Sequence, residues 1–347
     1  MRLDAVTLAL PSRSVANDDV VALVEHHSRA TYAGDLDRLL TGLRVLLRRS
    51  GADHRYWLAP GEEVLPLVAD AVKRALAAAG CARSEVDLLI CGSVDRGFVE
   101  PATAYLLAQA LELRAVSCFD VVDACNGWTR SLQLVDALLR TGAYRRALIV
   151  NAEFPMFEGG PIYPRLFSLH NRDEIAWSFA GYTLGEGVTA TLLSADSDNK
   201  WELHLSSRPD LADRSTVPLN GYQRYCRPSE RIGLNGTGHF VAFSREMFDE
   251  ATREVAQLFR KLQTPIGDLR AIFPHGATRR TWDEGGKLLG VDHLMYHVYP
   301  QYGNLISASL PAGLATAIDA GHLRRGDRFA ICGASAGMSF AVGAFEY

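Results

Sequence analysis

The sequence predicts an α/β protein made of two similar halves, and three observations lead to this prediction. Short apolar runs typical of buried strands alternate with amphipathic helical segments over most of the 347 residues. The order helix, apolar strand, polar turn, helix and apolar strand occurs within residues 64–153 and again within residues 245–337. The strands are almost continuously apolar, which indicates sheets covered by helices on both faces. We expect a duplicated chain, with an N-terminal half over residues 1–195 and a C-terminal half over residues 196–347.

The first hundred residues follow this alternation. The pattern predicts a strand at the N-terminus, a helix beginning near Asn17 and a second helix over residues 35–47. A third helix is expected over residues 65–79, followed by a strand in VDLLICGSV. A fourth helix is expected to open at Pro101, because proline fits the first turn of a helix.

The most informative stretch runs from a strand through a sharp turn into a helix. A strand is predicted over residues 118–122, a helix over residues 128–139 and another strand over residues 146–151. Cys125 therefore lies where a strand ends and a helix begins, where unpaired N–H groups and the helix dipole stabilise a thiolate. Gly127 would leave room for a substrate approaching the sulfur. The turn alone also fits a small buried cysteine with a structural role.

Two further polar residues lie at corresponding places in the second half. His275 follows the apolar run LRAIFP, and Asn304 lies in the turn YGNLISASLP. Each alone fits a structural role, as a hydrogen-bonded histidine or as a helix N-cap. In a duplicated chain, however, residues at equivalent strand-to-helix turns meet at the seam between the halves, where such folds bind ligands. Cys125, His275 and Asn304 therefore form one candidate constellation.

Composition and charge exclude several classes of protein. Hydrophobic residues make up 48% of the chain and charged residues 22%, and the net charge of −4 argues against general nucleic-acid binding. The six cysteines are scattered without a CxxC pair, which suits reduced thiols better than disulfides or a zinc site. No apolar run reaches the ~18 residues of a membrane span, and residues 1–14 favour a first strand over a signal peptide. We expect a cytoplasmic protein that contacts neither membrane nor nucleic acid.

Four motifs carry a resemblance to a known family: DACNGW, PHGATRR, YGNLISASLP and GASAGMSF, in this order. Together they resemble the thiolase superfamily of condensing enzymes, and specifically 3-oxoacyl-acyl-carrier-protein synthase III, or ketosynthase III. The resemblance covers nearly the whole chain. It implies a five-layered αβαβα fold, a homodimer, and acyl thioesters of coenzyme A or of acyl carrier protein as substrates. It implies no metal or redox cofactor.

The resemblance also implies roles for individual residues. Cys125 would attack a thioester and become acylated. The backbone N–H groups of Cys125 and Ala336 would form the oxyanion hole. His275 and Asn304 would stabilise an enolate or oxyanion of the second substrate, and His275 could also act as a general base.

Basic and acidic residues near the expected site are read in two ways. Arg280 resembles the basic residue on the rim that faces the thioester carrier, and Arg279 and Arg49 are expected to bind the same substrate, although Arg49 also fits a solvated helix end. Glu100, in DRGFVEPATAY, resembles a glutamate base of the head-to-head condensing enzymes of olefin biosynthesis. It would reach the second substrate in the other subunit, whereas the simpler alternative is a solvated loop acid.

Departures from the family pattern point to a specialised, natural-product relative. The usual His-Gln-Ala-Asn, triple-glycine and Gly-Asp-Gly-Ala sequences are His-Gly-Ala-Thr at 275–278, Ser-Ala-Gly at 335–337 and Gly-Glu-Gly-Val at 185–188. Our first hypothesis is Claisen condensation of the acyl enzyme with a second thioester, forming a 3-oxoacyl product. The second is direct acyl transfer to an amine or hydroxyl of a small-molecule acceptor, for which the irregular stretch at 154–179 could shape a pocket. A third reading, an inactive partner subunit, is opposed by the intact Cys, His and Asn set.

Overall fold

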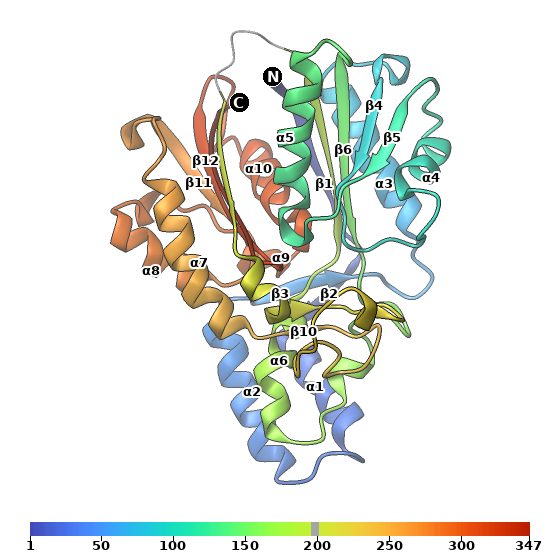
Figure 1. Ribbon diagram of the computed structural model, residues 1–347, viewed down its shortest axis with the longest axis vertical. Coiled ribbons are helices and arrows are strands. Elements are labelled where there is room, and N and C mark those ends of the chain that lie inside the picture. Colours follow the sequence, from blue (N-terminus) through green and yellow to red (C-terminus); the bar gives the residue numbers. More distant parts are fainter. Residues whose placement is uncertain (196–200) are drawn as a thin grey trace.

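The first half of the chain builds a mixed five-stranded sheet. The computed structural model describes residues 1–195 and 201–347, and Figure 1 shows their arrangement. In this sheet β7 pairs antiparallel with both β1 and β6, and β4 pairs parallel with both β6 and β5. In spatial order its strands are β1 (Arg2–Ala9), β7 (Gly187–Ser194), β6 (Arg146–Glu153), β4 (Leu88–Cys91) and β5 (Ser117–Asp120).

The second half repeats this order in a second sheet. Its strands are β8 (Glu202–Ser207), β13 (Ser339–Glu346), β12 (Arg328–Ser335) and β11 (Leu269–Pro274). The order β8, β13, β12, β11 corresponds to the order β1, β7, β6, β4 of the first sheet, with the same parallel and antiparallel pairings. The place of β5 is taken by the segment at Met295, which forms a single parallel bridge with Ile272 of β11. The two halves therefore share one topology, as a duplication requires.

Helices fill three layers around the two sheets (Figure 1). Side chains from α5 and α10 pack in one apolar cluster with residues of both sheets, so these helices form the central layer. The outer face of the first sheet is covered by α3 and α4, and that of the second by α7 and α8. The five-layered αβαβα fold is thus confirmed. The helices are α3 (Val64–Ala78), α4 (Thr103–Ala110), α5 (Gly127–Arg140), α7 (Ser244–Phe259), α8 (Arg279–Leu289) and α10 (Ser309–Asp319).

The apolar composition of the central strands follows from this layering. In β6, Ala147 and Ile149 face the central helices, whereas Leu148 and Val150 face the outer ones. All four side chains are fully buried. Because successive residues of a strand point to opposite faces, a sheet covered on both sides needs apolar residues at every position rather than at alternate ones.

A smaller lobe lies below the sheets in Figure 1. It has its own apolar cluster, to which the stretch at 162–184 contributes. Its elements are α1 (Asn17–Ser28), α2 (Leu36–Ser50), β2 (Arg13–Ala16), β3 (His54–Trp57), α6 (Ile175–Ser178), β9 (Ser215–Thr216), β10 (Val241–Ala242) and the short α9 (Tyr299–Tyr302). The irregular segment predicted at 154–179 contains only α6 and single turns of 3₁₀ helix, and it packs against α1 and α2.

Most of the expected elements are present, with two qualifications. The helix expected to open at Pro101 begins at Thr103, and its first N–H groups, those of Thr103 and Ala104, are capped by the carboxylate of Asp120. The expected boundary between the halves, after residue 195, adjoins residues 196–200, which lie outside the described residues. Within the described residues, none of the helices has both the length and the apolar character needed to cross a bilayer.

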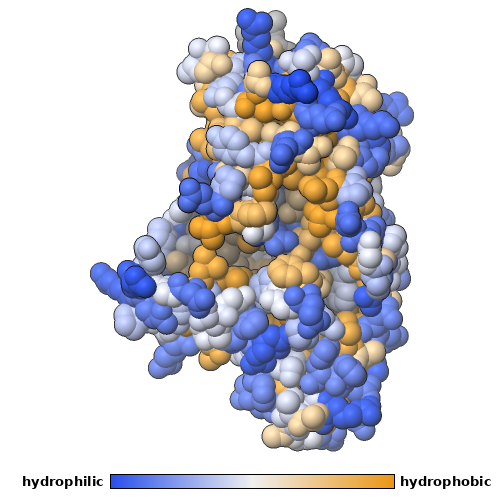
Figure 2. Space-filling view, turned by 90° about the vertical axis from the view of Figure 1, so that its right-hand side faces the viewer, coloured by the Kyte–Doolittle hydropathy of each residue, from blue (hydrophilic) through white to orange (hydrophobic). Residues whose placement is uncertain are grey.

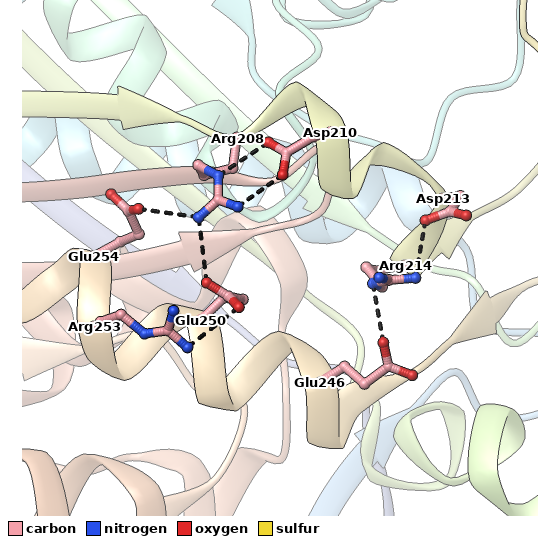
Figure 3. A network of polar contacts seen from close by, with 8 residues as sticks. All are labelled: Arg208, Asp210, Asp213, Arg214, Glu246, Glu250, Arg253 and Glu254. Atoms are coloured by element: carbon pink, nitrogen blue, oxygen red, sulfur yellow. Dashed lines mark hydrogen bonds and ion pairs between the residues drawn. The ribbon is translucent and has the colours of Figure 1, made fainter.

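Ion pairs hold α7 to the segment that follows β8 (Figure 3). The guanidinium of Arg208 lies 2.7 Å from the carboxylate of Asp210 and 3.3 Å from that of Glu250. Arg214 pairs in the same way with Glu246 at 3.0 Å. The backbone of Arg208 also pairs in both directions with that of Met338, in the turn between β12 and β13. This network therefore joins α7 to the glycine-containing turn near the candidate site.

Candidate active site

Cys125 lies in a tight turn between the first sheet and the central layer. After β5 the chain makes a single 3₁₀ turn, Ala124–Asn126, and enters α5 at Gly127. Ala124 has a φ of 44°, in the left-handed region that residues with a Cβ seldom occupy. Such strain persists only where the surroundings enforce it, and here it places the cysteine at the helix N-terminus, as the sequence predicted.

Gly127 is required for a different reason from the one expected. Its backbone is helical, with φ −51° and ψ −42°, so its conformation does not need glycine. A Cβ at this position would lie 2.1 Å from the carbonyl oxygen of Gly92, at the end of β4. That oxygen is itself fixed by the side-chain amide of Asn151, at 2.8 Å. The missing side chain therefore admits a neighbouring backbone, and Gly127 is not among the residues that line the cavity.

Residues of the second half hold the cysteine turn in place. The hydroxyl of Ser335, at the end of β12, donates to the carbonyl of Asp123 at 3.1 Å and accepts from the N–H of Asn126 at 3.3 Å. The hydroxyl of Ser339, at the start of β13, donates to the Asp123 carboxylate at 3.1 Å and accepts from the Asn126 amide at 3.0 Å. Ser335 stands where the family has glycine, and this departure adds two hydrogen bonds across the seam between the halves.

The protein environment of Cys125 keeps its thiol neutral. Burial raises the pKa of the Cys125 thiol to about 12, and the buried carboxylate of Glu153 acts in the same direction. The hydroxyl of Ser335 and the N–H of Cys125 itself lower the pKa but do not offset these effects. The expectation of a stabilised thiolate at this turn is therefore wrong, because desolvation of the Cys125 sulfur outweighs the local hydrogen-bond donors.

His275 follows β11 directly and is held by its backbone, whose N–H donates to the carbonyl of Cys332 at 2.8 Å. The side chain is 3% exposed, and its Nδ1 has no hydrogen-bond partner within the described residues. Burial lowers the pKa of His275 to about 4, so the imidazole is neutral near pH 7. A neutral imidazole can either accept a proton or donate a hydrogen bond to a developing oxyanion.

Asn304 lies just before α10, and its orientation is fixed by its contacts. Its backbone forms a bridge with Leu184, in which the Asn304 N–H donates to Thr183 at 2.8 Å. Its side-chain Oδ1 accepts from the N–H of Ile306 at 2.9 Å. Since an N–H can only donate, the oxygen must face Ile306, which leaves the NH₂ group as the donor available to a ligand. Asn304 lines the same cavity as Cys125 and His275.

These residues line a single cavity of about 1270 Å³. Ala336 also lines it, in the turn whose Gly337 has a φ of 115°. Of the predicted arginines, the exposed Arg49 and Arg280 lie among the lining residues, whereas Arg279 does not. Arg280 pairs with Glu284 of its own helix at 2.7 Å. The structure therefore brings the predicted Cys, His and Asn together, with two of the three arginines.

Glu100 is placed differently. It is exposed and absent from the residues that line the cavity of its own chain, although the preceding residues Arg96 to Val99 do line it. Within one chain Glu100 is a solvated loop acid, which was the simpler of the two sequence interpretations. Its action in the other subunit stays a prediction.

Sequence reasoning missed two acids near the site. Glu153, at the end of β6, is fully buried and accepts from the N–H groups of Val94 and Asp95, each at 3.0 Å, and from the hydroxyl of Ser307. Burial raises the pKa of Glu153 to about 7. Asp95 lines the cavity itself. The duplication could have revealed Asp95, because its loop follows β4 as His275 follows β11.

The described residues include no cluster of three or more His, Cys, Asp or Glu residues placed to hold a metal ion. The expectation that no cofactor is needed stays a prediction.

Comparison with known proteins identifies the relatives of this chain. Residues 119–155 match the sequence family described as 3-oxoacyl-(acyl-carrier-protein (ACP)) synthase III, and residues 259–347 match the family of its C-terminal part. The beta-ketoacyl-(acyl-carrier-protein) synthase III of Sphingopyxis alaskensis is 29% identical, over 86% of this chain and 89% of its own. That of Clostridium perfringens is 27% identical, over 85% and 87%.

Solved structures share the fold over almost the full length. Xanthomonas campestris OleA, crystallised with bound lauric acid and lauroyl-CoA, superposes with a TM-score of 0.81 at 20% identity, covering 99% of this chain and 98% of its own. The 3-oxoacyl-(acyl-carrier-protein) synthase III of Aquifex aeolicus gives 0.77 at 19%, covering 100% and 99%. The family matches, the relatives and the shared fold agree with the four motifs, and over most of its length the chain is similar to 3-oxoacyl-(acyl-carrier-protein) synthase III enzymes.

Proposed function

We propose that the chain is an acyltransferase that forms an acyl-Cys125 thioester from acyl-CoA or acyl carrier protein. It then passes the acyl group to a second substrate by Claisen condensation, giving a 3-oxoacyl product in secondary metabolism. The observation that carries the proposal is that Cys125, His275 and Asn304 line one cavity at the seam between the two halves. The departures at 185–188, 275–278 and 335–337 support a specialised pathway over fatty-acid initiation.

In the loading step, Sγ of Cys125 attacks the carbonyl carbon of the thioester. The bond from that carbon to the carrier sulfur breaks, and the carrier leaves as a thiol. The Cys125 proton passes to the neutral His275 and from there to the departing sulfur. Burial keeps Cys125 and His275 neutral before the transfer. Charging them in a buried site costs free energy, and the attraction between the resulting thiolate and imidazolium offsets this cost.

In the condensation step, Glu100 of the partner subunit removes a proton from the α-carbon of a second thioester, and the resulting enolate attacks the acyl carbon on Cys125. A carbon–carbon bond forms, and the Cys125 sulfur leaves. The enolate oxygen would be stabilised by the NH₂ group of Asn304 and by an N–H of His275, and the oxyanion on the acyl carbon by the N–H groups of Cys125 and Ala336. Neutral donors suit this role, because they require no proton transfer.

The alternative is direct transfer of the acyl group to an amine or hydroxyl. It is supported by the segment at 154–179, from which Pro155, Phe157 and Phe179 line the cavity beside Cys125. This wall could enclose a small-molecule acceptor. The two functions differ in their product, a 3-oxoacyl thioester in one case and an ester or amide in the other.

A second copy of the chain is the partner we propose for the face that carries β5 and α4. β5 is an edge strand, and the neighbouring Phe98, Val99, Tyr105 and Val122 are between 48% and 90% exposed. Figure 2 looks onto this side of the molecule and shows hydrophobic residues gathered around a hollow. Unpaired strand edges and apolar patches of this kind favour pairing with another chain. Glu100, in the same loop, would then approach the partner's cavity.

Intact-protein mass spectrometry after incubation with a panel of acyl thioesters tests the loading step. The wild-type chain should gain one acyl group, and Cys125→Ala should gain none while keeping its fold. If Cys125→Ala also gained an acyl group, Cys125 would not be the nucleophile. Analysis of the released product then separates condensation from transfer to an amine or hydroxyl.

Glu100 is tested by complementation. Glu100→Gln should load Cys125 normally yet transfer poorly, and mixing it with Cys125→Ala should restore one working site in each heterodimer. If the Glu100→Gln homodimer transferred the acyl group at the full rate, a group other than Glu100 would remove the proton from the second substrate.

A further inference from the structure

Asp95 is a carboxylate in a cavity that is otherwise without one. Among the described residues that line the cavity, Asp95 alone is acidic. Most of the other lining residues are apolar, among them Val94, Val122, Phe157 and Ile162, and the charged ones, which include the adjacent Arg96, are arginines. A carboxylate among apolar side chains is costly unless a partner is provided, so its presence needs an explanation.

The position of Asp95 is fixed by the backbone around it. Its N–H donates to the buried carboxylate of Glu153 at 3.0 Å, and its own Oδ2 accepts from the N–H of Phe154 at 3.0 Å. In the described part of the chain, no side chain donates to Asp95 and no cation pairs with it. Burial raises the pKa of Asp95 to about 6, although the N–H groups of Phe154 and Arg96 oppose this. The charge is thus held in place with unused acceptor capacity.

Asp120, on the neighbouring β5, shows what a structural carboxylate does here. Both of its oxygens are used, accepting from Thr103 at 2.7 Å and from Ala104 at 2.9 Å to cap α4. Asp120 does not line the cavity. Asp95 also accepts from backbone N–H groups, but it caps no helix among the described elements and it lines the cavity, so a structural role like that of Asp120 does not account for it.

The loop after β4, which carries Asp95, lies on the opposite side of the molecule from α7 and α8 (Figure 1). The exposed Arg280, which we assign to the thioester carrier, belongs to α8. With the carrier on the α8 side and its thioester at Cys125, the acyl chain would extend beyond the sulfur toward the wall that contains Asp95.

We propose that Asp95 binds a hydroxyl or ammonium group on the acyl chain delivered to Cys125. The preferred donor is then an acyl thioester with a hydrogen-bond donor on its chain, and not a plain saturated one. This inference rests on the proposed acylation of Cys125. Its chemical basis is that a site built around a buried acceptor rejects an analogue that leaves the acceptor unpaired.

The test compares initial rates of Cys125 acylation by hexanoyl-, 3-hydroxyhexanoyl-, 6-hydroxyhexanoyl- and 6-aminohexanoyl-CoA, followed by intact-protein mass spectrometry. The wild-type chain should load at least one substituted donor about 10- to 100-fold faster than hexanoyl-CoA, the range set by an unpaired buried acceptor. Asp95→Leu should abolish or reverse the preference. Asp120→Asn, which alters a carboxylate outside the cavity, should keep it. Each variant is judged by the ratio of its loading rates for two donors. A general loss of folded protein lowers both rates equally and leaves this ratio unchanged.

Each outcome has a distinct meaning. A preference for the amino donor or for one hydroxy donor, lost in Asp95→Leu, supports the inference and identifies the group that is bound. Loading of hexanoyl-CoA as fast as every substituted donor, with Asp95→Leu unchanged, overturns the inference and leaves the proposed function intact. If neither chain loads any thioester, or if Cys125→Ala also gains acyl mass, the proposed function itself fails.

Discussion

Replacing Gly127 by alanine tests how closely the cysteine turn depends on its packing. The residue is helical, so alanine would suit its backbone and would raise the intrinsic stability of α5. The obstacle is the Gly92 carbonyl, 2.1 Å from where the new Cβ would lie. Contact between carbon and another heavy atom is optimal at roughly 3.5 Å, so helix and strand would have to separate by about 1.4 Å. Neither can yield freely, since Asn151 holds the Gly92 oxygen.

The size of the effect follows from this displacement. Overpacking of a tight site costs about 1–3 kcal/mol of unfolding free energy. A shift of about 1 Å in a reacting group costs on the order of 10²-fold in rate. We therefore expect Gly127→Ala to lower the free energy of unfolding by about 2 kcal/mol and to slow acylation of Cys125 by about 10²-fold.

Gly42→Ala is the matched control. Gly42 is also a helical glycine, in α2, but a Cβ there would have no atom within 4 Å. This variant should gain about 0.5–1 kcal/mol of stability and load normally. Denaturant unfolding and intact-protein mass spectrometry measure the two quantities. If Gly127→Ala loaded within threefold of wild type and were as stable as Gly42→Ala, the steric reasoning would be refuted.

Three further predictions concern the same region. Without substrate at pH 7.5, iodoacetamide should label the exposed Cys226 faster than Cys125, because burial raises the pKa of the Cys125 thiol. Peptide mapping locates the label, and faster labelling of Cys125 would show that a thiolate is present there. Ser335→Ala should lower the free energy of unfolding by about 1–3 kcal/mol and slow loading, since it removes two hydrogen bonds, one from the Asn126 N–H and one to the Asp123 carbonyl. The Asn126 N–H keeps its second acceptor, the carbonyl of Asp123 at 2.9 Å. Equal rates and stability in wild type and variant would show that Ser335 does not support the turn. Glu153 has a pKa raised from 4.5 to about 7, so the folded state keeps its proton to higher pH than the unfolded chain does. Its contribution to stability is complete below about pH 4.5 and is lost as pH rises through 7, a change of about 3 kcal/mol. In Glu153→Gln, denaturant unfolding at several pH values should show this part of the pH dependence removed, and identical profiles for wild type and variant would contradict the assignment.

The sequence was sufficient for the architecture because periodicity reports burial on each face of an element. The alternation of core-facing residues in β6 and the apolar stripe of α5 are local properties, readable from about a dozen residues. The duplication then aligned the turns, which brought Cys125, His275 and Asn304 to one seam.

What the sequence did not reveal depends on contacts between distant segments. The burial that keeps Cys125 protonated comes from residues of both halves, and a helix N-terminus alone suggested the opposite. The reason for Gly127 lies in Gly92, 35 positions away in the chain. Asp95 lies in a loop without periodicity, where polar residues are ordinary, and only the cavity distinguishes it from Glu100.

The hydrogen bonds from Ser335 and Ser339 to the cysteine turn have a consequence for biosynthesis. A ribosome completes the first half long before it makes these two serines, which lie among the last 13 residues of the chain. Until then the strained turn at Ala124 lacks two of its supports, and the N–H of Ala336, which we propose as an oxyanion donor, has not yet been made. A chain that ends before these serines therefore cannot form the hydrogen bonds that hold the Cys125 turn against the second half.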